Sequence, residues 1–249
     1  DQVDPLSDIA TVDTELALAD LETVERALDK SLKGSKNGDK TQLQMAHLFE
    51  RVRAWLDRGA PIRRMALVQV ERAALKPLCL LTAKPVLYVS NVDEHDLDGG
   101  EGSNVAAVKA HAQISGDELV LVSARIEQEI AMLDHQERSV FLNDLGLAES
   151  GLDRVIRAGY SLLGLRTFFT AGPKEARAWT IKSGMTASAA AGVIHTDFER
   201  GFIRAETIAY DDFVALGGEQ GARDAGRLRL EGRDYVVNDG DIMHFRFNV

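Results

Sequence analysis

The residues whose types and spacing could bind a ligand lie in two short segments, each directly after an apolar run. Residues 91–94 read Asn-Val-Asp-Glu and follow the run 85–89, and residues 123–125 read Ser-Ala-Arg and follow the run 119–122. Carboxamide, hydroxyl and backbone groups can hydrogen-bond the edge of a planar heterocycle. Ligands of parallel sheets bind where the strands end at their carboxyl side. The two segments together therefore form the first candidate for a binding site.

Neither segment is specific by itself. The N-x-x-E spacing of Asn91 and Glu94 arises often by chance, and an Asn after a strand is also a common turn residue. Their joint order carries more weight, because both follow predicted strands and Asn91 and Ser123 stand 32 positions apart. This order favours a shared site over two unrelated turns.

Histidine offers a second type of candidate chemistry. His195 and Asp197 could suggest a catalytic dyad, but no nucleophile stands beside them, and Phe198 and Gly201 mark a loop. A structural or surface role is therefore favoured over catalysis. The histidines of the chain show no ligand spacing, so we predict no metal site made by protein side chains alone; they are His47, His95, His111, His135, His195 and His244.

A phosphate-binding loop of the form G-x-x-x-x-G-K-[ST] cradles nucleotide phosphates with backbone amides and a lysine. The dipeptide Gly-Lys occurs nowhere in the 249 residues. Residues 96–99 spell D-x-x-G, a pattern of nucleotide switches, but they follow Asn91 instead of preceding it, and we interpret them as a chance match. We therefore expect no nucleotide hydrolysis by this chain alone, and we assign no catalytic residue.

The elements that must position the Asn91 and Ser123 segments form a β-α-β unit. Period and composition predict buried strands at Pro85–Val89 and Leu119–Val122, with a helix at Asn104–Ile114 between them. A strand, a helix and a second strand indicate a mainly parallel sheet. Upstream, helical spacing predicts helices at Thr14–Leu32 and Lys40–Arg58. These two apolar stripes, joined by a short polar loop, indicate an antiparallel helical hairpin.

The net charge of −10 argues against nucleic-acid binding by bulk electrostatics. The charge is uneven, at −1 for residues 165–249 and −9 for residues 1–164, so the C-terminal part is the better candidate for any RNA contact. It contains a basic cluster on a predicted helix whose inward face would hold Ala222, Ala225 and Leu228. The cluster consists of Arg223, Arg227, Arg229 and Arg233. A solvated helix face is the alternative interpretation of these arginines.

The single cysteine, Cys79, excludes an intrachain disulfide and a multi-cysteine metal site, which is typical of a reducing cytoplasm. It lies in the apolar run Pro77–Leu81, where we expect a buried, unreactive thiol. That run is far shorter than the roughly 20 apolar residues of a membrane span. Residues 1–5 lack the basic and apolar blocks of a signal peptide. We expect a soluble, cytoplasmic protein.

Beyond these local patterns, the whole chain resembles a known family. Stretches that carry the likeness are residues 13–22, 151–160, 176–181 and 195–205, together with the two segments at Asn91 and Ser123. On these stretches the chain resembles the Obg-like ATPases, the YchF family of P-loop nucleotide-binding proteins. It departs from the family pattern at the amino end, where the P-loop and switch segments are expected. Ligands for Mg²⁺ would belong to that segment.

The resemblance implies a role for each residue of the two segments. Guanine-binding relatives of this fold carry Asn-Lys-x-Asp and Ser-Ala-x loops that grip the purine. Here Val92 and Glu94 replace the Lys and Asp, which implies that ATP is preferred over GTP. By analogy, Asn91 meets the N7 edge, Val92 meets the adenine ring, and the loop at Ser123 and Ala124 completes the base site.

The resemblance also implies the domain organisation. Residues 1–13 and 75–164 would form the remainder of an incomplete parallel-sheet nucleotide-binding domain, interrupted by the helical hairpin at 14–74. Residues 165–249 resemble a TGS domain, which has a β-grasp, ubiquitin-like fold. Within it we predict strands at Ala176–Ile181 and Met243–Phe247, an extended pair at Phe202–Thr207 and Tyr235–Val237, and a helix at Ser188–Ile194.

Two functions follow from this α/β organisation. The first is the C-terminal portion of a ribosome-associated ATPase that, when intact, uses ATP and Mg²⁺. The second is a non-catalytic fragment that binds the ribosome or RNA through its TGS domain. In both cases the expected partner is the ribosome or ribosomal RNA, and neither a membrane nor DNA is expected.

Overall fold

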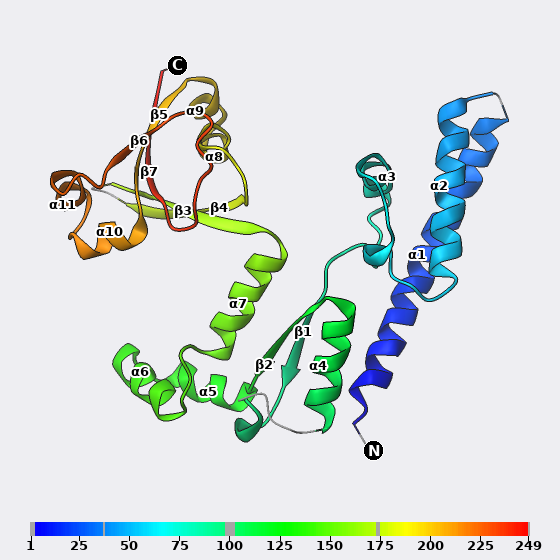
Figure 1. Ribbon diagram of the computed structural model, residues 1–249, viewed down its shortest axis with the longest axis horizontal. Helices are drawn as coiled ribbons and strands as arrows, with labels where there is room; N and C mark the ends of the chain where they lie inside the picture. The colour runs from blue at the N-terminus through cyan, green and yellow to red at the C-terminus, as the bar shows by residue number, and fades with distance from the viewer. Residues whose placement is uncertain (1–2, 37, 98–102, 173–174, 249) are drawn as a thin grey trace. The chain divides into compact units, whose positions relative to one another are not determined.

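The computed structural model describes residues 3–36, 38–97, 103–172 and 175–248 (Figure 1). The chain divides into two compact units, Asp1–Ala158 and Gly159–Val249. The division falls within a helix, α7 (Gly151–Leu162). The predicted boundary between residues 164 and 165 lies a few residues further on and stays a prediction. None of the described helices is both long and apolar enough to cross a membrane.

The N-terminal unit begins with an antiparallel helical hairpin, as predicted. Its helices are α1 (Pro5–Ser35) and α2 (Lys40–Leu56). Helix α1 starts nine residues before the predicted Thr14, because Asp4 caps it by accepting a hydrogen bond from the Ser7 amide and Pro5 occupies its first turn. Asp39 caps α2 through the amides of Thr41 and Gln42.

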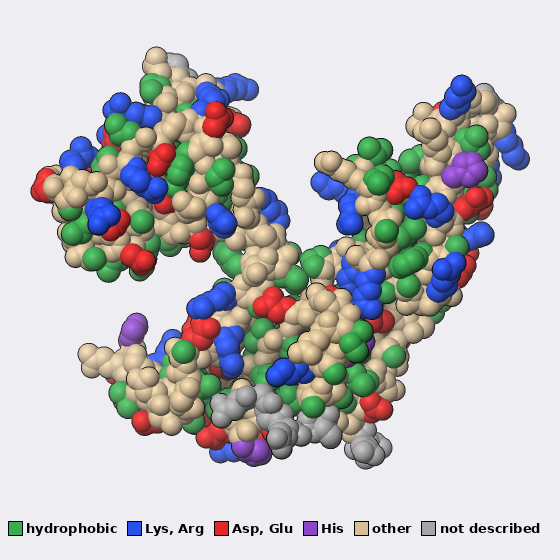
Figure 2. Space-filling view, viewed as in Figure 1, with side chains coloured by type: hydrophobic (Ala, Val, Ile, Leu, Met, Phe, Trp, Pro, Cys, Tyr) green, Lys and Arg blue, Asp and Glu red, His purple; other side chains and the backbone are tan. Residues whose placement is uncertain are grey.

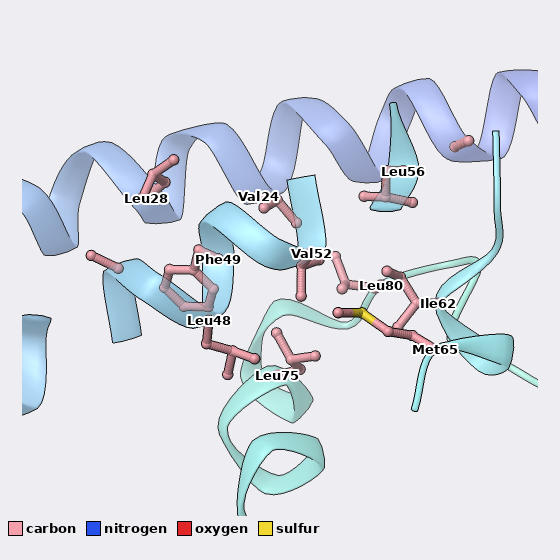
Figure 3. Packing of buried hydrophobic residues seen from close by; sticks show 12 residues of the cluster. Val24, Leu28, Leu48, Phe49, Val52, Leu56, Ile62, Met65, Leu75 and Leu80 are labelled. Atoms are coloured by element: carbon pink, nitrogen blue, oxygen red, sulfur yellow. The ribbon is translucent and has the colours of Figure 1, made fainter. Parts of the chain in front are cut away.

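The hydrophobic core of the hairpin also holds the chain that follows it. Val24 and Leu28 of α1 pack against Phe49, Val52 and Leu56 of α2 (Figure 3). Three short elements then close over this core: η1 (Ile62–Arg64), α3 (Gln69–Leu75) and η2 (Lys76–Leu78). These elements and the residues that follow them contribute the buried side chains Ile62, Met65, Leu75 and Leu80. The sequence patterns predicted none of these three elements.

Cys79 is exposed, so the expectation of a buried thiol is wrong. The apolar run Pro77–Leu81 is not buried along its whole length. The 3-10 turn η2 ends at Leu78, and Cys79 adopts a left-handed conformation with φ of 50°. This reversal directs Leu80 into the core and leaves the thiol at the surface.

The β-α-β unit is confirmed. Strands β1 (Leu87–Asn91) and β2 (Glu118–Val122) pair in parallel, with Asn91 opposite Val122, and α4 (Ser103–Ser115) connects them (Figure 1). Strand β1 starts two residues after the predicted Pro85, in agreement with the lack of a proline N–H for the ladder. After the strands come η3 (Glu94–Asp96), α5 (Ala124–Met132) and α6 (His135–Asp144).

The C-terminal unit is a five-stranded mixed sheet in the order β4-β3-β7-β5-β6. The strands are β3 (Leu165–Ala171), β4 (Ala176–Lys182), β5 (Phe202–Ile208), β6 (Arg229–Glu231) and β7 (Ile242–Phe247). Only β3 and β7 pair in parallel; the other neighbours are antiparallel. Helix α8 (Ala187–Ile194) covers one face with Ala187, Ala190 and Ala191, whose small side chains allow close approach to the core residues Phe168 and Phe245.

Three details of this unit differ from the predictions. Strand β3 was not predicted, and Tyr235–Val237 forms no strand, since Val236 makes a single bridge to Thr186. Helix α11 (Glu219–Asp224) ends before Ala225 and Leu228, so these residues do not extend an inward helix face. Gly226, with φ of 69°, turns the chain toward β6. The remaining helices are α9 (Thr196–Arg200) and α10 (Tyr210–Ala215). The TGS assignment itself stays a prediction.

Candidate functional site

The Asn91 and Ser123 segments meet at the carboxyl ends of β1 and β2. The Asn91 side-chain oxygen Oδ1 accepts a hydrogen bond from the Ala124 amide at 2.9 Å. The Val92 amide donates to the Val122 carbonyl at 2.8 Å, which extends the ladder past the end of β1. Two segments that stand far apart in the sequence are thus joined into one loop pair.

The hydrogen bond to Ala124 shows which end of the Asn91 carboxamide is the oxygen and which is the amino group. A backbone N–H can only donate, so its partner atom must be the oxygen, and the Nδ2 amino group carries the remaining donors. The Asn91 residue is exposed. The loop pair therefore presents an amide donor that suits an acceptor such as a purine ring nitrogen.

Val92 and Glu94 have different surroundings. Val92 is half-buried and packs against an apolar cluster that includes Leu97 and Ile126. Glu94 is exposed at the start of η3. It lines a pocket of about 350 Å³ with His95, Leu97, Ile126, Asp144 and Leu145. The carboxylates of Glu94 and Asp144 make this pocket acidic, so it is an unfavourable place for phosphate.

The loop at Ser123 and Ala124 is held in place by contacts between α5 and the start of α7. Ser123 is buried, with 4% of its surface exposed, and Ala124 after it begins α5 and is exposed. Glu127 accepts hydrogen bonds from the Gly151 amide at 2.6 Å and the Leu152 amide at 3.2 Å. A Cβ on Gly151 would lie 2.9 Å from a Glu127 oxygen, so a side chain at this position would require the Glu127 carboxylate to shift. The start of α7 thereby fixes α5 and the loop before it.

The structure also bears on the other candidates from the sequence, which are the His195–Asp197 pair, the D-x-x-G pattern and a metal site. The His195 Nδ1 accepts a hydrogen bond from the Asp197 amide at 3.2 Å and caps α9, which is a structural role. Of the D-x-x-G pattern, Asp98 and Gly99 lie outside the described residues. Within the described ranges, no group of three or more His, Cys, Asp or Glu side chains is arranged to hold a metal ion.

The four arginines of the predicted basic cluster each contact a side chain of the C-terminal unit. Arg223 pairs with Glu219 at 2.7 Å, and Arg227 lies 3.8 Å from Asp212. Arg229 pairs with Asp241 at 3.1 Å and also approaches Glu231. Arg233 donates to the Ser188 hydroxyl. Each arginine already has an acceptor, which weakens the cluster as a phosphate-binding patch.

A groove on the surface of the paired strands β5 and β7, called here the β5–β7 groove, has a different charge balance. Its volume is about 530 Å³ and its lining is Ile203, Arg204, His244, Phe245, Arg246 and Phe247, without a carboxylate. Arg204 and Arg246 share one nearby acid, Glu206, at 3.7 and 3.1 Å. The hydrogen-bonded Arg246 guanidinium holds the Glu206 pKa below its ordinary value, so this acid stays ionised. Two guanidinium groups thus lie near this one carboxylate at the groove.

Comparisons with known proteins show which relatives the chain resembles. A family model described as "YchF-GTPase_C: Protein of unknown function (DUF933)" matches residues 165–248. The "Ribosome-binding ATPase YchF" of Bacillus subtilis is 49% identical over all 249 residues, which span 68% of its own length. The Haemophilus influenzae protein of the same name is 52% identical with the same coverage. The "Obg-like ATPase 1" of Oryza sativa is 38% identical over 64% of its length.

Solved structures show the same likeness. The Schizosaccharomyces pombe YchF GTPase aligns with a TM-score of 0.84 at 33% identity, covering 98% of this chain and 67% of that one. A GTP-binding protein from Pyrococcus horikoshii aligns with a TM-score of 0.59 at 18% identity and supports the fold alone. Fold and relatives together define a GTPase-like nucleotide-binding protein of the P-loop class. Within that class, the chain belongs to the YchF family of Obg-like ATPases.

Proposed function

We propose that this chain is the base-recognising and ribosome-contacting part of a YchF-type ATPase that binds and hydrolyses ATP in preference to GTP and works in the cytoplasm. The observation that carries the nucleotide part is the Asn91–Ala124 hydrogen bond, since it joins the two loops and leaves an amide donor exposed. The ribosome part rests on the relatives named as ribosome-binding ATPases.

In this proposal the Asn91 amide donates to the purine N7, an acceptor common to adenine and guanine. Val92 supplies an apolar contact for the ring, and main-chain atoms around Val92 meet the adenine edge. Glu94 does not reproduce the short carboxylate that pairs both guanine donors in GTPases. Ser123 and Ala124 hold the second loop against Asn91, which keeps the donor in place.

The described residues do not fit a Mg²⁺ site, since they offer no suitable acidic cluster. Bound Mg²⁺ would neutralise charge on the transferring phosphoryl group. Its ligands and the phosphate-binding lysine belong, in this proposal, to residues other than those that the structure describes. The part played by this chain is to orient the base and to dock on the ribosome.

Nucleotide selectivity tests the base site. In a protein extended at its amino end to the length of its relatives, the double variant Val92→Lys and Glu94→Asp is expected to shift the ATP-to-GTP affinity ratio toward GTP by about tenfold or more. The restored carboxylate can pair two guanine donors, a match of roughly 1–3 kcal/mol. Competition binding measures the ratio, and an unchanged ratio would remove these two residues as the selector.

The matched control is Asn91→Asp in the same extended protein. It keeps the acceptor for Ala124 but replaces the outward amide donor by an oxygen, which repels N7. ATP and GTP should therefore weaken together while their ratio stays the same. A selective loss of only one nucleotide would contradict the assignment of Asn91 to the N7 edge.

Co-sedimentation with ribosomes tests whether the β5–β7 groove is the ribosome contact of the proposed function. The variant Arg204→Ala removes the groove guanidinium that makes no hydrogen bond to Glu206, and it should reduce co-sedimentation with ribosomes by about threefold or more and flatten its decline with salt, because only a few phosphate contacts are involved. The variant Arg223→Ala removes the same charge from a partnered arginine and should bind nearly as the parent does. If the variant at Arg223 lost more co-sedimentation than the variant at Arg204, the ribosome contact would instead be assigned to the cluster at Arg223. Salt-independent binding by all three proteins would favour an apolar or protein-mediated contact.

A further inference from the structure

A pocket in the N-terminal unit has no part in the site at Asn91. It lies among η1, α3, η2 and the chain that follows them, and its volume is about 590 Å³. Its floor is apolar and includes the buried side chains Ile62, Leu75 and Leu80, which belong to the hairpin core (Figure 3). The volume falls within the range of small-molecule sites, roughly 300–1,000 Å³.

The charged residues that line this pocket are all cationic. They are Arg63, Arg72, Lys76 and Lys84, and no aspartate or glutamate belongs to the lining. Arg72, Lys76 and Lys84 are exposed, and no described carboxylate forms an ion pair with any of these three. Apolar and cationic side chains lie next to one another over the α3 segment in Figure 2. In a chain of net charge −10, this is a local excess of positive charge.

Arg63 differs from the other three cations of the lining, because a buried carboxylate lies beside it. Only 10% of its side chain is exposed, and its Nε lies 3.7 Å from an Asp117 oxygen, too far for a hydrogen bond. Its buried Nε and Nη2 donors have no hydrogen-bond partner within the described structure. The neighbouring Asp117 Oδ2 acceptor is also buried without a hydrogen-bond partner among the described residues, so Arg63 and Asp117 offset one another in charge, and the excess positive charge of the pocket comes from Arg72, Lys76 and Lys84.

We propose that this pocket binds a small amphipathic organic anion, with its apolar body on the Ile62–Leu75–Leu80 floor and its acidic group among the exposed cations Arg72, Lys76 and Lys84. The apolar floor accounts for the body and the all-cationic lining for the charge. None of the residues of the base site lines this pocket, so the inference is independent of the proposed nucleotide function.

Cys79 makes the inference directly testable. It lines the pocket, is exposed, and is the single cysteine of the chain. The probe is anilinonaphthalene sulfonate, an apolar anion, and its neutral counterpart is N-phenylnaphthylamine. Fluorescence titration of the 249-residue chain should give an affinity for the sulfonate about tenfold higher than for the neutral amine, since a charge-assisted contact of this size is typical. The sulfonate at saturation should slow modification of Cys79 by N-ethylmaleimide at least about fivefold.

Charge-reversal variants assign the binding to this pocket. Lys76→Glu/Lys84→Glu should weaken the sulfonate by about tenfold or more and leave the neutral amine nearly unchanged. Lys30→Glu/Lys33→Glu changes the net charge equally on α1, outside the lining, and should stay within about twofold of the parent. Circular dichroism confirms that both variants are folded. Dye binding that leaves Cys79 modification unchanged, equal losses in the two variants, or equal affinity for the neutral amine would each overturn the proposal.

Discussion

Replacement of Asp20 by Ala is expected to lower the free energy of unfolding of the N-terminal unit by about 3 kcal/mol. Asp20 lies on α1 with only 2% of its surface exposed. Its carboxylate accepts hydrogen bonds, each 2.7 Å long, from the Leu81 amide, the Thr82 amide and the Thr82 hydroxyl. The variant leaves these donors without an acceptor in a largely buried place, and each costs roughly 1 kcal/mol or more.

This carboxylate matters because it holds the chain after η2 onto the hairpin. The Thr82 hydroxyl in turn accepts a hydrogen bond from the Ile62 amide, so the bonds continue into η1. Urea denaturation measures the loss, with Trp179→Phe as background so that Trp55 alone reports on the N-terminal unit. Asp29→Ala is the control, since Asp29 is exposed on the same helix and carries the same charge. Equal losses in the two variants would show that helix electrostatics, and not the buried bonds, account for the effect.

The second large effect concerns the C-terminal unit. Phe168→Ala should cost about 3–5 kcal/mol, the usual loss for a fully buried aromatic side chain. Phe168 is completely buried. Its ring lies 5.7 Å from that of Phe245 and 6.5 Å from that of Trp179. The cavity opens at the centre of the sheet, where α8 cannot collapse without moving its three buried alanines.

Phe169→Ala is the control in the same strand. Phe169 is half-buried, and its ring lies near Tyr210, so its loss should be clearly smaller. Hydrogen exchange of the β3 and β7 amides measures the loss of stability of the C-terminal unit in both variants. If ribosome binding depends on this unit, Phe168→Ala should also lose co-sedimentation at a lower temperature than Phe169→Ala does. Similar exchange in the two variants would contradict the place of Phe168 at the centre of the core.

Short-range signals in the sequence predicted much of the framework. The apolar stripes of the hairpin and the start of α2 at Lys40 were correct, because periodicity and the Asp39 cap act within one or two turns. Strand β2 and helix α4 were placed to within one residue, and β4, α8, β5 and β7 were also recognised. The N-terminal cap at Asp4 was missed, since residues 5–13 carry no regular apolar stripe.

The sequence patterns did not predict the elements that form through contacts with distant parts of the chain. The segment 59–84 has no strong period, and its short helices form because the hairpin core accepts Ile62, Leu75 and Leu80. Strand β3 is stabilised by β4 and β7, which follow it in the chain. The expected arginine helix stops at Asp224 because the chain turns to add β6 to the sheet.

The sequence by itself determined the family, the β-α-β unit and the residue types at the ends of its two strands. Only the tertiary structure decided which atoms of those residues remain available. The Oδ1 of Asn91 is engaged by Ala124, Val92 is partly packed away, and the arginines at 223 and 227 are paired with acids. The physical reason is that a hydrogen bond or ion pair depends on which side chains meet in space, whereas local patterns report only the preferences of neighbouring residues.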